Sequence, residues 1–256
     1  MSERLRSKLI TAGVALLFAA PLAVLLVQAF ADSWRAPAVL PQALGSRGFE
    51  VAFGSGGAGE ALANSIVVAL TVTTISIVVG WPAARVLGRR RLSRNGLVLL
   101  LIAIPLLMPP FLAGFGLTEW FIRLGIDDSL AGLILAHVTF ALPYAILILL
   151  SGFSRELESL EEMASTVGAS PGARLRWVTV PALRPTLAAA GLLCFLVSFS
   201  QYGSSLAVGA GRPTLPIVLL PFVQSDAQVA AALALVFLAP CVMALVVASR
   251  LQRNPF

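Results

Sequence analysis

Six long apolar segments, separated by shorter polar stretches, dominate the pattern of hydrophobic and polar positions along this chain. A helix needs about 20 apolar residues to cross the hydrocarbon core of a bilayer, which is about 30 Å thick. The six segments are Leu9–Ala31, Leu62–Leu87, Leu97–Leu117, Leu130–Ser151, Leu183–Ser205 and Val229–Ser249. Prolines interrupt the third segment, and prolines kink membrane helices. The pattern therefore predicts an all-α integral membrane protein with six transmembrane helices.

The composition excludes the soluble and the disordered classes of protein. Apolar residues make up 58% of the 256 residues and charged residues 12%, whereas a soluble domain carries about 25% charged residues. A disordered chain needs low hydrophobicity and high charge. Cys194 and Cys241 both lie within predicted spans, so we expect them to pack as small apolar side chains.

The 18 Lys and Arg residues are divided unevenly between the two sides of the predicted membrane. Fourteen lie in the N-terminus, the second-to-third linker, the fourth-to-fifth linker and the C-terminus, and four lie in the other loops. The fourteen are Arg4, Arg6, Lys8, Arg85, Arg89, Arg90, Arg91, Arg94, Arg155, Arg174, Arg176, Arg184, Arg250 and Arg253. Cytoplasmic loops carry the excess of positive charge, so both termini are predicted to be cytoplasmic. The net charge of +6 therefore indicates orientation in a membrane, not a nucleic-acid partner.

The first segment ends in Ala29-Phe30-Ala31, which fits a signal-peptide cleavage site. Its apolar run of 23 residues is too long for the 7–15 residues of a signal-peptide core, so we expect an uncleaved span. Cleavage would leave five spans in the same orientation. The loop from 32 to 61 is rich in Gly, Pro and Ser, and we expect it to be a flexible periplasmic connection.

The linker between the fourth and fifth spans, residues 152–181, differs from the other cytoplasmic linkers. Four carboxylates keep it out of the bilayer: Glu156, Glu158, Glu161 and Glu162. Ser154 is a suitable N-cap for a helix that ends at Gly168, and Pro171 is suited to begin another. We therefore predict two short amphipathic helices. The residues alone leave three roles open: a surface anchor, a cap over the helix bundle, or a docking element for a cytoplasmic partner.

Part of this linker resembles the EAA signature of permease subunits of type I binding-protein-dependent ABC importers. That signature reads Glu-Ala-Ala, three residues, Gly-Ala, five residues, Phe, two residues, Ile, one residue and Leu-Pro. Glu162, Ala164, Gly168, Ala169 and Pro181 match it at the same spacing. Met163 replaces the first Ala, and Leu175, Val178 and Val180 replace the other apolar positions.

The resemblance implies a division of the chain and a mechanism. Residues 60–250 would be the permease core of five spans, with the EAA loop at 152–181, after an N-terminal span and periplasmic loop at 1–59 and before a cytoplasmic tail at 251–256. A cytoplasmic coupling helix at about 162–177 would seat on an ATPase subunit and drive alternating access. The residues implied in coupling are Glu162, Ala164, Gly168, Ala169, Pro171, Leu175 and Pro181.

The resemblance also implies partners: an ABC ATPase dimer, a second permease subunit (the same or a paralogue) and a periplasmic substrate-binding protein. The chain has no Gly-x-x-x-x-Gly-Lys-Ser/Thr motif, and Lys8 is its only lysine. We therefore expect no enzyme activity, no cofactor and no metal in this chain, with ATP and Mg²⁺ on the partner ATPase. The expected location is the bacterial inner membrane.

Polar residues within spans are costly unless they face protein or water. The substrate pathway is predicted at Asn64, Thr71, Ser198, Gln201, Tyr202 and Ser205. Ser198, Gln201 and Ser205 are spaced to share one face of a helix. The alternative is helix–helix packing through small hydroxyl residues. Residues 200–202 and 211–216 are similar to permeases for polyamines, thiamine, ferric iron and phosphonates, so we expect a small polar substrate.

Two other interpretations remain open at this stage. His137, the only histidine, either contacts a substrate or proton or makes a helix–helix hydrogen bond. Paired with an intramembrane serine, it would instead belong to a hydrolase. A scaffold or regulator that does not transport is the second alternative.

Residues 215–222 form an apolar piece that is too short to span a membrane and is expected to be re-entrant or interfacial. Residues 224–228, which follow it, are expected to face a binding protein.

Overall fold

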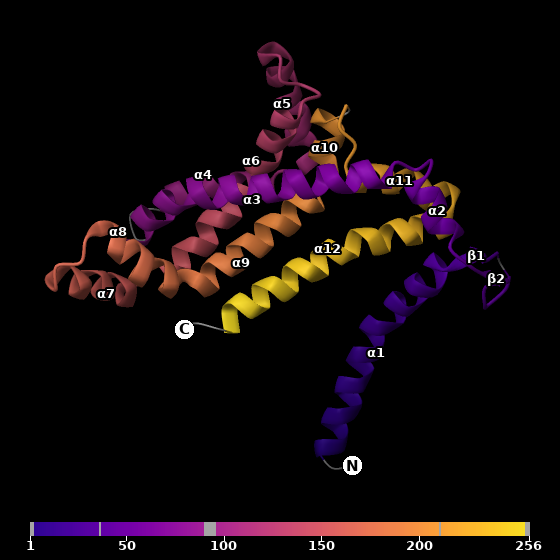
Figure 1. Cartoon of the computed structure of the whole chain (residues 1–256), viewed down its shortest axis with the longest axis horizontal. Coiled ribbons are helices and arrows are strands. Elements are labelled where there is room, and N and C mark those ends of the chain that lie inside the picture. Colours follow the sequence, from indigo (N-terminus) through magenta and orange to yellow (C-terminus); the bar gives the residue numbers. More distant parts are fainter. Residues whose placement is uncertain (1–2, 36, 90–95, 210, 254–256) are drawn as a thin grey trace.

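The computed structural model describes residues 3–35, 37–89, 96–209 and 211–253, and these are almost entirely helical (Figure 1). The elements before the middle of the chain are α1 Glu3–Ala29, β1 Ala31–Ser33, β2 Ala43–Leu44, α2 Arg47–Phe53, α3 Ala58–Arg89, α4 Gly96–Leu107 and α5 Pro110–Leu124. Those that follow are α6 Leu130–Gly152, α7 Arg155–Thr166, α8 Pro171–Arg174, a π-helical turn Leu175–Thr179, α9 Val180–Phe199, α10 Gly203–Val208, α11 Leu215–Ser225 and α12 Ala227–Arg253.

Five helices in the described part of the chain are long and apolar enough to cross a membrane. They are α1, α3, α6, α12 and the continuous helix Pro171–Phe199, which joins α8 to α9 through the π-helical turn. A sixth span is present if α4 and α5, which meet at 97°, are taken together. The third segment, predicted at Leu97–Leu117 with prolines that interrupt it, is therefore built from two helices that meet at a sharp bend. The helix breaks because Pro109 has a non-helical backbone and Pro110 begins α5.

The helices α3, α6 and α9 lie against one another in the middle of the molecule, and α12 packs along α9 (Figure 1). Figure 1 shows α7 and α8 at one end of this layer and α2 with the hairpin β1–β2 at the other. Helix α1 diverges from the layer and contacts α12 near Ala29, Ala231 and Ala232. We call residues 154–179, which contain α7, α8 and the π-helical turn, the knob.

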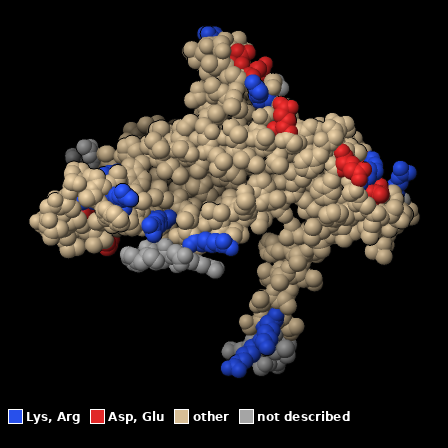
Figure 2. Space-filling view, viewed as in Figure 1, with Lys and Arg blue, Asp and Glu red and all other residues tan. Residues whose placement is uncertain are grey.

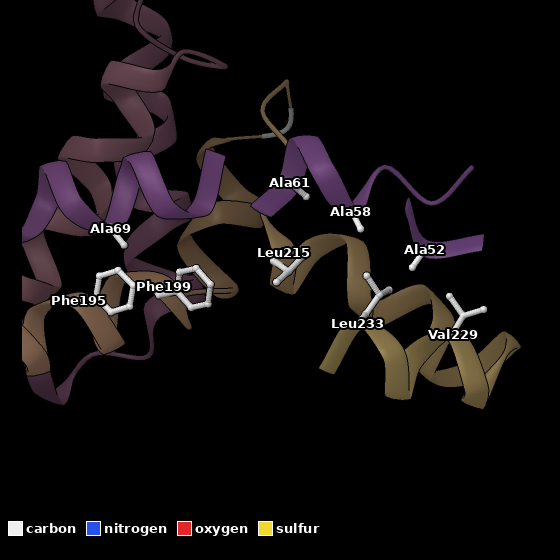
Figure 3. Packing of buried hydrophobic residues seen from close by; sticks show 9 residues of the cluster. All are labelled: Ala52, Ala58, Ala61, Ala69, Phe195, Phe199, Leu215, Val229 and Leu233. Atoms are coloured by element: carbon white, nitrogen blue, oxygen red, sulfur yellow. The ribbon is translucent and has the colours of Figure 1, made fainter. Parts of the chain in front are cut away.

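The largest buried cluster joins α2, α3, α9, α11 and α12 (Figure 3). Small side chains on α3, at Ala58, Ala61 and Ala69, leave room for Phe195 and Phe199 of α9 and for residues of the last two helices. The two phenylalanine rings stack 5.3 Å apart. Close packing through small residues is typical of membrane helices, which gain no hydrophobic free energy by leaving lipid.

Charged side chains gather at the ends of the molecule and leave a broad apolar band between them (Figure 2). One charged region lies over the knob, another over α2 and the neighbouring end of α12, and others at the tip of α5 and the N-terminal end of α1. This distribution is that of a multi-pass membrane protein. Arg90, Arg91 and Arg94 of the predicted basic linker, and the end of the predicted tail 251–256, lie outside the described residues.

Two further predictions need correction. The loop 32–61, expected to be flexible, contains the hairpin β1–β2 and α2, and Arg47 of α2 forms an ion pair of 2.5 Å with Asp226. The predicted fifth span Leu183–Ser205 is also wrong at its end, because the helix stops at Phe199 and resumes as the separate α10. The apolar piece expected after it is confirmed as the 11-residue helix α11.

Candidate functional site

The knob begins and turns as the sequence predicts. The Ser154 hydroxyl accepts a hydrogen bond of 3.4 Å from the Leu157 amide and caps α7. Gly168 has φ +82°, a left-handed conformation that glycine adopts without strain. The amides of Gly168 and Ala169 donate to the carbonyls of Ser165 and Ala164, which closes α7 with a Schellman motif. The second helix starts at Pro171 as predicted, but it is not short, because it continues into α9.

The outer surface of the knob combines a carboxylate with large apolar side chains. Glu162, Gly168, Pro171 and Leu175 are exposed, whereas Ala164, Ala169 and Pro181 are partly buried. Two further apolar side chains of the knob are strongly exposed, Val167 by 83% and Trp177 by 71%. Exposed apolar patches of this kind mark surfaces that bind another protein or a membrane. Six of the seven predicted coupling residues thus lie within the knob, and the seventh, Pro181, follows it at the start of α9.

Behind this surface lies a buried ionic cluster that sequence reasoning did not single out. Glu161 is only 5% exposed. Its Oε2 accepts from Arg85 at 2.9 Å and from Arg89 at 2.5 Å, and its Oε1 accepts from the Thr179 hydroxyl at 2.6 Å. We call these four residues the Glu161 cluster. Burial alone would raise the pKa of Glu161, but the bonds from Thr179 and the two arginines outweigh it and hold the pKa below its ordinary value.

The Glu161 cluster connects three elements. Glu161 belongs to α7, the two arginines form an i, i+4 pair at the end of α3, and Thr179 lies in the π-helical turn before α9. The wide turn precedes Pro181, whose ring would crowd a carbonyl four residues earlier in an α-helix. The sequence does carry a signal for the cluster, since Glu161 lies one turn after Leu157 on the apolar face of α7.

Within the membrane region, a polar cluster surrounds His137 of α6. Its Nδ1 lies 3.0 Å from the Ser198 hydroxyl and its Nε2 lies 2.8 Å from the Ser205 hydroxyl. Ser205 also donates to the Gln201 carbonyl at 2.7 Å. The neutral tautomer with hydrogen on Nε2 satisfies all of these bonds, with Ser198 donating to Nδ1.

Three predicted pathway residues therefore lie near one another, but not on a helix face as predicted. The helix ends before Gln201, and His137 binds the two serines across the gap between α9 and α10. Tyr202 follows Gln201 and is partly buried, and Thr71 on α3 is also partly buried. Asn64 makes a different contact, because its side-chain amide donates to the Pro213 carbonyl at 3.1 Å and helps hold the chain before α11.

An apolar groove of about 540 Å³ runs between α3, α9 and α12. Thr73 and Arg184 are its polar lining residues, and the predicted pathway residues are not among those that line it. Within the described ranges, no group of three or more His, Cys, Asp or Glu side chains is placed to hold a metal ion.

Comparisons with known proteins agree on one family. The family model described as "Binding-protein-dependent transport system inner membrane component" matches residues 76–254. The molybdenum transport system permease protein of Mycobacterium tuberculosis is 32% identical over 201 residues, 72% of this chain and 76% of that protein. The trehalose transport system permease protein of the same species is 35% identical over 173 residues, 65% of this chain and 62% of that protein.

A solved structure shares the fold. A chain of a bacterial ABC transporter involved in the import of the acidic polysaccharide alginate superimposes with a TM-score of 0.69 at 17% identity, and the match covers 98% of both chains.

Proposed function

We propose that this chain, which belongs to the family of inner-membrane components of binding-protein-dependent transport systems, forms half of a substrate pathway and couples it to a separate ATPase through the knob. The chain is a permease subunit of an ABC importer, a multi-pass protein of the inner membrane, and not an enzyme. The coupling role and the residues that perform it are our proposal.

The observation that carries the proposal is the exposed surface of the knob. A carboxylate at Glu162 lies among exposed apolar side chains, including Val167 and Trp177, on an element that projects from the helix layer (Figure 1). A basic groove on an ATPase would pair with Glu162 and cover the apolar residues. The knob continues into α9 without a break in the helix, so a push on the knob moves a membrane span directly.

The proposed topology has six spans, with α4 and α5 together as the third, and both termini in the cytoplasm. Its support is the sorting of basic residues toward the N-terminal end of α1 and the knob (Figure 2). The division into a periplasmic loop and N-terminal span at 1–59, a core at 60–250 and a tail at 251–256 goes with this topology.

The proposed assembly contains two permease subunits, an ATPase dimer that carries ATP and Mg²⁺, and a periplasmic binding protein that docks near residues 224–228. The substrate pathway would include Asn64, Thr71, Ser198, Gln201, Tyr202 and Ser205. We propose a small polar solute as substrate. The names of the relatives indicate molybdenum in one system and trehalose in another, so permeases that are each about a third identical to this chain serve chemically different substrates.

Purification of the chain from its native membrane tests the proposal. We expect mass spectrometry to find an ABC ATPase with it, and a Leu175→Cys variant to crosslink to that ATPase through an engineered cysteine in its groove. The matched control is Leu112→Cys, an exposed apolar position on α5, which should not crosslink. Absence of an ATPase from the complex would contradict the proposal. Stimulation of ATP hydrolysis by the substrate-loaded binding protein is expected of a transporter and not of a scaffold.

A further inference from the structure

We infer that the Glu161 cluster makes the knob, the end of α3 and the start of α9 move as one body when the partner ATPase moves the knob. This inference rests on the proposed function and adds a mechanical route to it. Glu161 is a positioning residue here, because it acts through α3 and not on substrate or nucleotide.

The chain connectivity explains why a side-chain link is needed. The knob is joined directly to α6 at one end and to α9 at the other. Helix α3 packs against both α6 and α9 but has no backbone connection to the knob. The ion pairs from Glu161 to Arg85 and Arg89 therefore attach α3 to an element more than 60 residues away in sequence.

The geometry makes Glu161 the critical member of the cluster. Both carboxylate oxygens are engaged, with two guanidinium groups on Oε2 and one hydroxyl on Oε1. The arginine side chains are 37% and 43% exposed, so water can hydrate them if the carboxylate is lost. Glu161 has no such alternative, since it is almost fully buried. A charged carboxylate at this depth requires its partners, so the three elements stay together as long as it is ionised.

Apolar packing next to the cluster stiffens the same junction. Ala84 of α3, Phe153 before the knob, Leu157 of α7 and Leu183 of α9 form one buried cluster. The Trp81 and Phe153 rings meet edge to face with centroids 5.4 Å apart. These contacts resist separation but permit sliding, whereas the ion pairs fix the register of α7 on α3.

The test compares reconstituted transporters that contain wild-type chain, Glu161→Gln, the double variant Arg85→Gln/Arg89→Gln, or Glu119→Gln. The last is a matched control, because Glu119 forms an exposed ion pair with Arg123 on α5. We expect Glu161→Gln to keep the ATPase bound and to retain basal ATP hydrolysis, whereas the double variant, which leaves the buried carboxylate without its guanidinium partners, should also lose stability. The stimulation of ATP hydrolysis by the loaded binding protein should fall by at least about fivefold, which is the lower end of typical coupling between two sites.

Three outcomes separate the possibilities. Unchanged stimulation in Glu161→Gln overturns the inference. Loss of stimulation only in proportion to loss of bound ATPase also overturns it, since the cluster would then serve stability alone. If wild-type transporter itself shows no stimulation, the proposed function has failed, and this failure is distinct from the other two.

A second measurement does not depend on the folding of any Glu161 variant. Spin labels at Val86→Cys on α3 and Ser165→Cys on α7, both exposed positions, report the distance between the two elements. We expect that distance to stay within about 2 Å between the nucleotide-free and ATP-bound states of the complex. A larger change would show that the knob moves relative to α3 and would refute the inference.

Discussion

Replacing His137 by alanine tests how the break between α9 and α10 is held. The variant leaves the Ser198 and Ser205 hydroxyls without their imidazole partner in a site where His137 is 2% exposed. Each lost bond costs about 1 kcal/mol in water-soluble proteins and about 0.6 kcal/mol in a membrane protein. The cavity left by the ring adds about 1 kcal/mol. We therefore expect a loss of about 2 kcal/mol in the free energy of unfolding, roughly thirtyfold in the equilibrium constant.

The assay is denaturant unfolding of the purified chain in detergent, followed by tryptophan fluorescence. Thr139→Ala is the matched control, because Thr139 lies on the same helix, is only partly buried and donates to the Leu135 carbonyl of its own turn. We expect transport by His137→Ala to persist in proportion to folded protein. Equal stability of the two variants would refute the structural role, and complete loss of transport with unchanged stability would indicate a proton or substrate contact instead.

Three further predictions follow from backbone geometry and charge. Gly168→Ala should destabilise the knob by about 1 kcal/mol, because a residue with a side chain is strained at φ +82°. Gly172→Ala should not destabilise it, because an added Cβ at that position meets no other atom. Hydrogen exchange of the α7 amides measures both effects. Gly114→Ala should loosen α5 from α10 and lower the melting temperature, because its Cβ would lie 2.8 Å from Ala207 Cβ, while Gly116→Ala on the same helix meets no neighbour. Because the pKa of Glu161 is lowered in the folded protein, its contribution to stability is present above its unfolded pKa of about 4.3 and is lost as pH falls through the folded value. Hydrogen exchange of the α7 amides should therefore rise below about pH 4 in the wild-type chain, and the Glu161→Gln variant should not show this rise.

The sequence predicted the parts of this structure that depend on local properties. The Ser154 cap, the Gly168 turn and the start at Pro171 each follow from a few neighbouring residues, and the structure confirms them. The signature residues of the knob were also identified from local spacing. Such features need no knowledge of which helices pack together.

The parts that sequence reasoning missed depend on tertiary contacts. Glu161 and Glu162 are adjacent acids in one helix, and the spacing from Leu157 indicates which of them is buried, but the arginines that pair with Glu161 lie on α3, more than 60 residues away in sequence. The end of α9 before Gln201 is likewise set by the contacts of α10 with α5 and α6, since residues 183–205 read as one apolar run. The prolines indicated an interruption between α4 and α5, but nothing in the local sequence predicted the angle of 97° between the two helices.

The central claim is that the knob carries a signal from the outside of the membrane to an ATPase inside. The most direct measurement is ATP hydrolysis by the reconstituted complex in the absence and presence of its substrate-loaded binding protein. We predict that loaded binding protein stimulates hydrolysis, and that Leu175→Arg, which places a charge on the exposed apolar surface of the knob, abolishes the stimulation while the permease stays folded. Hydrolysis that is indifferent to the loaded binding protein, or stimulation that survives Leu175→Arg unchanged, would contradict the account.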